Sequence, residues 1–228
     1  MGALVTEKTY LAAQCRCGAG GYLTPADAEC AFNVPRYQLP EMVVDAVPVQ
    51  APPRTNRAAI HEAAHALFVH ALGFQILQIT ADGQPHCAHG HIPDHTARVA
   101  IALAGDHGER LILHRLEYRP LCDEVAATFQ VVREMRFGGC DGCSAAFGLF
   151  CALGSSAADE VLLAANRTVE AATIALIREP ISTAAIRHLS EALMSIGTVS
   201  GPEVHRIFEE VGVGFGSRRI TMEGVIHA

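Results

Sequence analysis

Beyond Asn56, apolar residues recur at every third or fourth position along most of the chain, which is the spacing of one buried helix face. This pattern predicts helices at about 56–72, 94–117, 121–135, 144–152, 155–179, 181–196 and 200–212. Gly73 suits a left-handed cap after the first helix. At the start of the last helix, Ser200 and Glu203 have the spacing of a capping box. The chain is therefore expected to be mainly α-helical.

One segment has the period of a strand. FQILQIT (74–80) alternates and is rich in β-branched residues, so we expect a strand there, followed by a turn at ADGQ. Upstream, LTPADAECAF has Thr24 where a short helix would begin, and VVDAVPVQAPPR is an extended connector. We divide the chain into a cysteine-containing extension with a proline-rich connector (1–50), a helical domain (51–212) and a C-terminal tail without a clear period (213–228).

The composition argues against several functions. Half of the 228 residues are hydrophobic, 18% are charged, and the formal net charge is −7. An acidic chain of this kind is not expected to bind nucleic acid or an anionic membrane surface. Lys8 is the only lysine, so the phosphate-binding loop that ends in Gly-Lys-Ser/Thr is excluded, and we expect no nucleotide.

Whether the cysteines are thiols or disulfides depends on the compartment in which the protein resides. No secretory signal is visible, and the longest uncharged run is short for a membrane span, so we expect a cytoplasmic protein. There, thiols or metal ligands are expected rather than disulfides. The eight cysteines are Cys15, Cys17, Cys30, Cys87, Cys122, Cys140, Cys143 and Cys151.

The first predicted helix carries a His-Glu-x-x-His motif, formed by His61, Glu62 and His65. Residues four apart lie about 40° apart around a helix, so both imidazoles can reach one ion. Glu62 lies to the side, where it can take a proton from a metal-bound water and pass it to a leaving amine. The alternative is a core helix with two satisfied histidines, but the apolar flanks favour a buried metal-bearing helix.

Two histidines do not complete a metal site, and the residues leave the third ligand open. His70 lies on another helix face, so the third histidine of metzincins is missing. Glu109 on the following helix is one candidate, as in thermolysin-like enzymes. Asp123, at the start of a later helix, is the other. A first-turn aspartate also has an ordinary explanation, since it complements the helix dipole.

Several segments resemble, in order, the peptidase domain of the FtsH family of AAA+ zinc proteases. HEAAHAL is similar to the family's HEAGHAL, ALAGDHGERLIL to its LLGGRAAEELIF helix, DEVAATFQVVREM to its NDLxxAT helix, and LSEALMSIGTVSGPEVHRIF to its closing helices. The resemblance covers about residues 56–210. It implies a zincin-like helix bundle that binds Zn²⁺ through His61, His65 and Asp123, with Glu62 as general base. Glu109 would then orient a ligand histidine.

The chain also departs from the family pattern. Ala64 replaces the glycine of the motif and adds a methyl group to the helix, and Cys122 stands where the family has asparagine. The sequence contains no ATPase module, so the resemblance implies a metallopeptidase acting on unfolded or small polypeptides. A homo-oligomer and a separate ATPase partner both stay open. A second hypothesis is a catalytically weak or inactive relative that serves as a protein-interaction module.

Three further features are open. HCAHGHIPDH (86–95) concentrates histidines in a loop that could hold a second metal or contact substrate. CDGC (140–143) has CxxC spacing and could form a structural zinc site with Cys15, Cys17 and Cys30, although partly buried thiols are the simpler interpretation. The strand at 74–80, if it lies at a sheet edge, could bind an extended peptide by main-chain pairing.

Overall fold

The computed structural model of the chain describes residues 10–12, 21–23, 55–83, 85–113, 122–133, 140–222 and 224–227. This part contains α2 (Asn56–Ala71), α3 (His95–Ile112), α4 (Cys122–Arg133), α5 (Asp141–Leu153), α6 (Asp159–Arg178), α7 (Pro180–Ile196) and α8 (Gly201–Val211). The strands are β1 (Tyr10–Ala12), β2 (Gly21–Leu23), β3 (Ile76–Thr80), β4 (His86–His89), β5 (Thr198–Ser200), β6 (Arg218–Thr221) and β7 (Gly224–His227). The predicted mainly α fold with a minor β element is confirmed.

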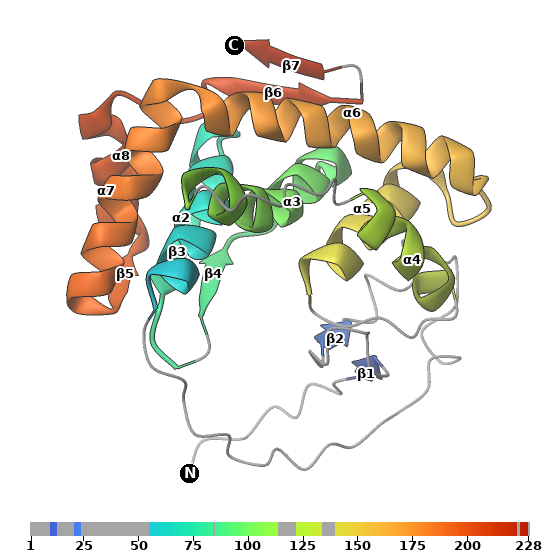
Figure 1. The fold of residues 1–228 in the computed structure, drawn as a ribbon, viewed down its shortest axis with the longest axis horizontal. Coiled ribbons are helices and arrows are strands. Elements are labelled where there is room, and N and C mark those ends of the chain that lie inside the picture. Colours follow the sequence, from blue (N-terminus) through green and yellow to red (C-terminus); the bar gives the residue numbers. More distant parts are fainter. Residues whose placement is uncertain are drawn as a thin grey trace.

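Helix α2, which carries the histidine motif, lies between α7 and α3 (Figure 1). The Thr55 hydroxyl accepts a hydrogen bond from the Ala58 N–H at 3.1 Å and caps its start. After Leu72, Gly73 has φ +84°, which confirms the predicted left-handed turn. Every residue from Glu62 to Ala71 is buried, because α3, α7 and the sheet all pack against this helix.

Helix α3 packs closely against α2 because Gly108 of α3 faces Ala64 of α2. A Cβ added to Gly108 would lie 2.4 Å from the Cβ of Ala64, so a side chain there would overlap with α2. The methyl group by which Ala64 differs from the FtsH motif therefore fits into the space that Gly108 leaves. The other faces of α3 pack against α5 and α6, so this helix fixes the position of α5 relative to α2.

The sheet has the order β4–β3–β5, and both pairings are antiparallel. The predicted strand, β3, is therefore central, with Gln78 paired to Ala88 on one side and Ser200 on the other. The interpretation of this strand as an edge is wrong. Within the described residues, β4 is the outer strand on one side, and it falls in the histidine-rich segment that was expected to be a loop.

The C-terminal part corrects two predicted helix ends. Pro180 does more than stop α6, since it occupies the first turn of α7. Ser200 is the N-cap of α8, but its side chain makes no capping hydrogen bond. The carboxylate of Glu203 is instead bound by Arg206 one turn later, so the predicted capping box does not form.

A pair of histidines joins the end of α2 to the C-terminal segment. His70 donates from Nε2 to the Val213 carbonyl at 3.0 Å, so its Nδ1 accepts from His205 Nδ1 at 2.7 Å. His205 Nε2 in turn accepts from the Ile76 N–H at 3.3 Å. The segment predicted as a tail without a period thus contacts the core, and it forms the β6–β7 hairpin.

Two further expectations concern the N-terminal segment and membrane-spanning helices. The predicted helix near Thr24 and the connector after it lie outside the described residues. In the part of the chain that is described, no helix combines the length and apolar character needed to cross a membrane.

Candidate metal centre

His61 and His65 project from the same face of α2, as the motif spacing predicts. Their Nε2 atoms are 3.1 Å apart, and the rings meet edge to face. The side chain of His65 is 10% exposed and that of His61 is 21% exposed. The pair therefore lies at the border between the core and solvent, with His61 on the open side.

The neighbours of the two rings determine which nitrogen carries the proton. His65 Nδ1 lies 2.6 Å from the Ile101 carbonyl, which can only accept, so Nδ1 donates and Nε2 keeps its lone pair. His61 Nδ1 lies 3.8 Å from carboxylate oxygens of both Asp106 and Glu109, which favour the proton on that nitrogen. The two Nε2 lone pairs then face each other. This is the tautomer that metal-ligating histidines adopt when the other ring nitrogen is held by an acceptor.

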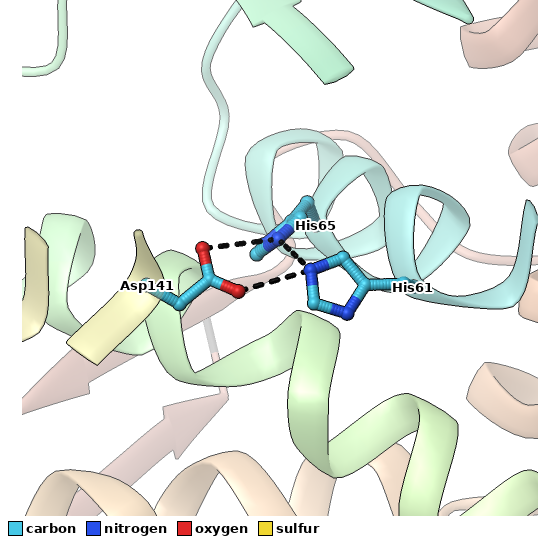
Figure 2. A group of neighbouring side chains, drawn as sticks. All are labelled: His61, His65 and Asp141. Atoms are coloured by element: carbon cyan, nitrogen blue, oxygen red, sulfur yellow. Dashed lines mark hydrogen bonds and ion pairs between the residues drawn. The ribbon is translucent and has the colours of Figure 1, made fainter. Parts of the chain in front are cut away.

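Asp141 brings a carboxylate to the same point. Its Oδ2 lies 2.9 Å from His61 Nε2 and its Oδ1 lies 3.5 Å from His65 Nε2. Figure 2 shows the resulting triangle, with the carboxylate facing both imidazoles. Ligand atoms that share a tetrahedral ion at about 2.0–2.2 Å stand about 3.3–3.6 Å apart. The 3.5 Å separation lies in this range, and the 2.9 Å and 3.1 Å separations are slightly shorter. The three residues form a group that could hold a metal ion.

Sequence reasoning missed Asp141. It is the first residue of α5, directly after the N-cap Cys140, whereas the helix was predicted to begin three residues later. The available signal was the same one used for Asp123, namely an aspartate in the first turn of a helix.

Asp123 lies in the first turn of α4, but its side chain is outside the described residues. Its predicted role as third zinc ligand therefore stays a prediction. In the described residues, the carboxylate that meets both histidines is that of Asp141.

Glu109 lies where the expectation for an orienting residue puts it. Its side chain is 4% exposed, Oε1 accepts from Arg57 Nε at 2.7 Å, and Oε2 lies 3.8 Å from His61 Nδ1. With Asp106 it also completes a second group of possible metal ligands on the Nδ1 side of His61. The guanidinium of Arg57 would repel a cation there, so we favour the group that contains His65 and Asp141.

Gly105 on α3 leaves the space that an ion would need. A Cβ built on this glycine would lie 2.4 Å from His65 Nε2 and 2.5 Å from His61 Nε2. These distances are close to a zinc–nitrogen bond length of about 2.0–2.1 Å. The missing side chain thus opens a cradle in front of both nitrogens, and any larger residue would fill it.

The charges of the site favour a cation. Burial alone would lower the pKa of His61, but the carboxylates of Asp141 and Glu109 outweigh it and raise that pKa to about 10. For Asp141, burial acts to raise the pKa, yet the charges of His65 and His61 hold it below its usual value. The cluster therefore binds a proton tightly when no other cation is present, as expected of converging acceptors.

Glu62 is buried beside the histidines, with 7% of its surface exposed. Burial raises the pKa of its carboxyl group, while His65 and His61 oppose the shift. The Glu62 charge also contributes, after burial, to raising the pKa of the Cys87 thiol on β4. Glu62 thus combines burial with a raised pKa, which are the properties expected of a carboxylate that acts as a general base.

The other cysteine- and histidine-rich segments form no comparable group. Among the described residues, both groups of possible metal ligands contain His61, and neither contains a residue of the 86–95 segment or of the CDGC cysteines. A second metal in the 86–95 segment is therefore not supported there. Cys15, Cys17 and Cys30 lie outside the described residues, so their part in a structural zinc site stays untested.

Comparison with known proteins identifies no matching family model and no matching curated protein. The FtsH resemblance therefore rests on the sequence motifs quoted above, and it stays a hypothesis.

Proposed function

We propose that this protein is a zinc-dependent metallopeptidase whose ion is held by His61, His65 and a carboxylate, with Glu62 as general base. One observation carries the proposal. The lone pairs of two imidazoles and the carboxylate of Asp141 converge within 3.5 Å, in an arrangement with three acceptors facing one another. Such a cluster is unfavourable unless a cation lies among its members.

The residue types favour zinc among the common ions. Two imidazoles and one carboxylate are a ligand set of catalytic zinc sites, which keep a fourth position for water or substrate. Zinc bound there would supply a Lewis acid that polarises a carbonyl group and lowers the pKa of water to about 7. Asp141, His61 and Asp106 have side chains that are 21–31% exposed, so a substrate would approach from their side.

Glu62 provides the acid–base chemistry. Its buried carboxylate, with a raised pKa, accepts the proton of the attacking water and then donates it to the amine that leaves from the cleaved peptide bond. His65 cannot share this task, because its Nδ1 proton is engaged by Ile101.

The substrate class follows from the sheet. Because β3 is paired on both sides, the outer strand β4 takes its place as the candidate for main-chain pairing with an extended peptide. Residues of β4 lie near enough to Glu62 for their charges to interact. We therefore expect cleavage within unfolded or short polypeptides and little cleavage inside stable helices.

Metal analysis combined with Glu62→Gln tests the proposal. The purified protein should contain about one zinc per chain and hydrolyse fluorescently labelled casein. Glu62→Gln should keep the zinc and lose at least ~100-fold in turnover, in keeping with the usual contribution of a general base. Glu203→Gln, on the exposed surface of α8, serves as the matched control and should change neither. A folded, zinc-free protein without turnover would instead support the protein-interaction module.

A further inference from the structure

The CDGC segment surrounds Asp141 with two thiols. Cys140 is the N-cap of α5, and its Sγ accepts a hydrogen bond from the Cys143 N–H at 3.5 Å. Cys143 is completely buried, whereas Cys140 is half-buried. Asp141 therefore lies between a partly buried cysteine and a completely buried one, within a single turn of backbone.

This arrangement suits a reversible disulfide. Side chains three residues apart on a helix have Cβ atoms about 5–6 Å apart. A disulfide requires Cβ atoms about 3.5–4.5 Å apart, so closing the bond draws the two residues together by about 1–2 Å. The Sγ of Cys140 already lies over the first turn, against the backbone N–H of its partner residue. Reactive CxxC pairs likewise place one accessible cysteine at a helix N-terminus.

We propose that Cys140 and Cys143 form a dithiol–disulfide pair whose state sets the position of Asp141 and thereby the affinity for metal. The second half of this inference rests on the proposed metal centre. The first half, the formation of the disulfide, is independent of it. The co-substrate is a small disulfide of the oxidised glutathione class.

The exchange balances in two steps. The Cys140 sulfur attacks one sulfur of the small disulfide, forms a mixed disulfide, and its proton leaves with the first released thiol. The Cys143 sulfur then attacks Cys140 Sγ, breaks the mixed bond, and its proton leaves with the second thiol. The protein loses two electrons and two protons, and one small disulfide becomes two thiols.

Oxidation should move Asp141 because it lies inside the ring that closes. The Cys140 Sγ must leave the Cys143 N–H and come within about 2.05 Å of a buried sulfur. The backbone of the first turn then follows toward the core. The Asp141 carboxylate is positioned by 2.9 and 3.5 Å contacts to the two imidazoles, so a shift of this turn weakens both.

The test begins with thiol mapping of the full chain in glutathione buffers of increasing oxidation. Alkylation before and after reduction, followed by peptide mass spectrometry, should show a Cys140–Cys143 disulfide that forms and is reversed by a phosphine reductant. Cys140→Ser should abolish it. Cys151→Ser, on the last turn of the same helix, is the matched control and should leave it intact.

Zinc affinity is then measured by chelator competition on the oxidised and reduced protein. We expect the oxidised form to bind at least ~10-fold more weakly, the range typical of lost ligand support, and Cys140→Ser to show no dependence on glutathione. Thiols that stay reduced in every buffer, or that pair with another cysteine, would overturn the dithiol pair. A reversible disulfide with unchanged zinc affinity would overturn the proposal that the disulfide sets the affinity for metal. Failure to bind zinc in either state contradicts the proposed metal centre, while the mapping still reports on the pair.

Discussion

Two histidine pairs involve helix α2, and their hydrogen bonding differs. His61 and His65 both lie on α2, whereas His70 near its C-terminal end pairs with His205 of α8. At the C-terminal end, His70 and His205 form a chain in which every ring nitrogen meets a partner of the opposite kind. Two donors and two acceptors alternate, so the pair is complete as neutral imidazoles. Burial lowers the pKa of both residues.

At the other pair, His61 and His65, acceptors converge. Each imidazole directs Nε2 toward the other and toward Asp141. Here the pKa of both histidines is raised despite burial. Because the shifts are opposite along one helix, burial alone does not account for the difference between the two pairs. The two pairs differ instead in whether donors or acceptors face their ring nitrogens.

The largest difference between the pairs should appear when a histidine is removed. His61→Ala or His65→Ala should reduce zinc affinity by more than ~100-fold, the upper range for residues that only support a ligand. His205→Phe should leave the zinc content unchanged, since hydrogen bonds already engage all four ring nitrogens of its pair. Inductively coupled plasma mass spectrometry on dialysed protein gives the comparison. Equal zinc content in all three variants would contradict the assignment of the metal to the His61–His65 pair.

Gly105→Ala should reduce zinc affinity nearly as much as His61→Ala or His65→Ala, although it retains every proposed ligand. The reason is that its Cβ would lie within 2.5 Å of both Nε2 atoms. Gly142→Ala is the matched control, since its Cβ would meet only Thr128 Cγ2 at 3.9 Å. Both changes favour helix by up to about 1 kcal/mol. Chelator competition measures the affinity, and circular dichroism verifies that both variants fold. Tight zinc binding by Gly105→Ala would place the ion elsewhere.

The loss of zinc affinity on replacing a carboxylate should be larger the closer that carboxylate lies to the two Nε2 atoms. Asp141→Asn keeps the shape but removes the charge, and should cost most of the zinc affinity. Glu109→Gln should cost about 10- to 100-fold, as expected for a residue that orients a ligand. Asp123→Asn, measured in the same chelator titration, decides between the two aspartates. A larger loss for Asp123→Asn than for Asp141→Asn would return the third-ligand role to Asp123.

The smallest effect should be the pH dependence of the His70–His205 pair. Because folding lowers both pKa values, the unfolded chain takes up protons at a higher pH than the folded chain. The stability from the pair is therefore full above the ordinary imidazole pKa of about 6.5 and is lost as the pH falls below it. In zinc-saturated protein, urea unfolding should show a smaller loss between pH 7.5 and 5.5 for His205→Phe than for wild type. Equal losses would show that the pair does not titrate.

The sequence predicted those features that depend on local spacing. The shared face of His61 and His65 follows from the helical period, and the end of α2 follows from Gly73. Strand β4 could not be predicted, because HCAH lacks a β-branched residue and becomes a strand only by pairing with β3. In the same way, Asp141 reaches the histidines only because α3 packs between α2 and α5.

The early start of α5 was missed for a local reason as well. Gly142 lies in its first turn and lowers helix propensity there, so the apolar period becomes clear only from Ser144. That Glu109 has partners could be anticipated, in contrast, since a buried carboxylate in an apolar helix needs them. Its oxygens lie 2.7 Å from Arg57 Nε and 3.8 Å from His61 Nδ1, and its role in orienting a ligand stays a prediction.

The ligands of the proposed centre come from α2 and α5, which are distant in the sequence and joined through the whole length of α3 and α4. An ion that links them acts on the unfolding equilibrium as a removable cross-link, because the unfolded chain does not hold these side chains together. By mass action, free zinc at 100 times its dissociation constant should add about 2.7 kcal/mol to the free energy of unfolding. Chelation should then lower the melting temperature of the wild type and leave that of His61→Ala unchanged.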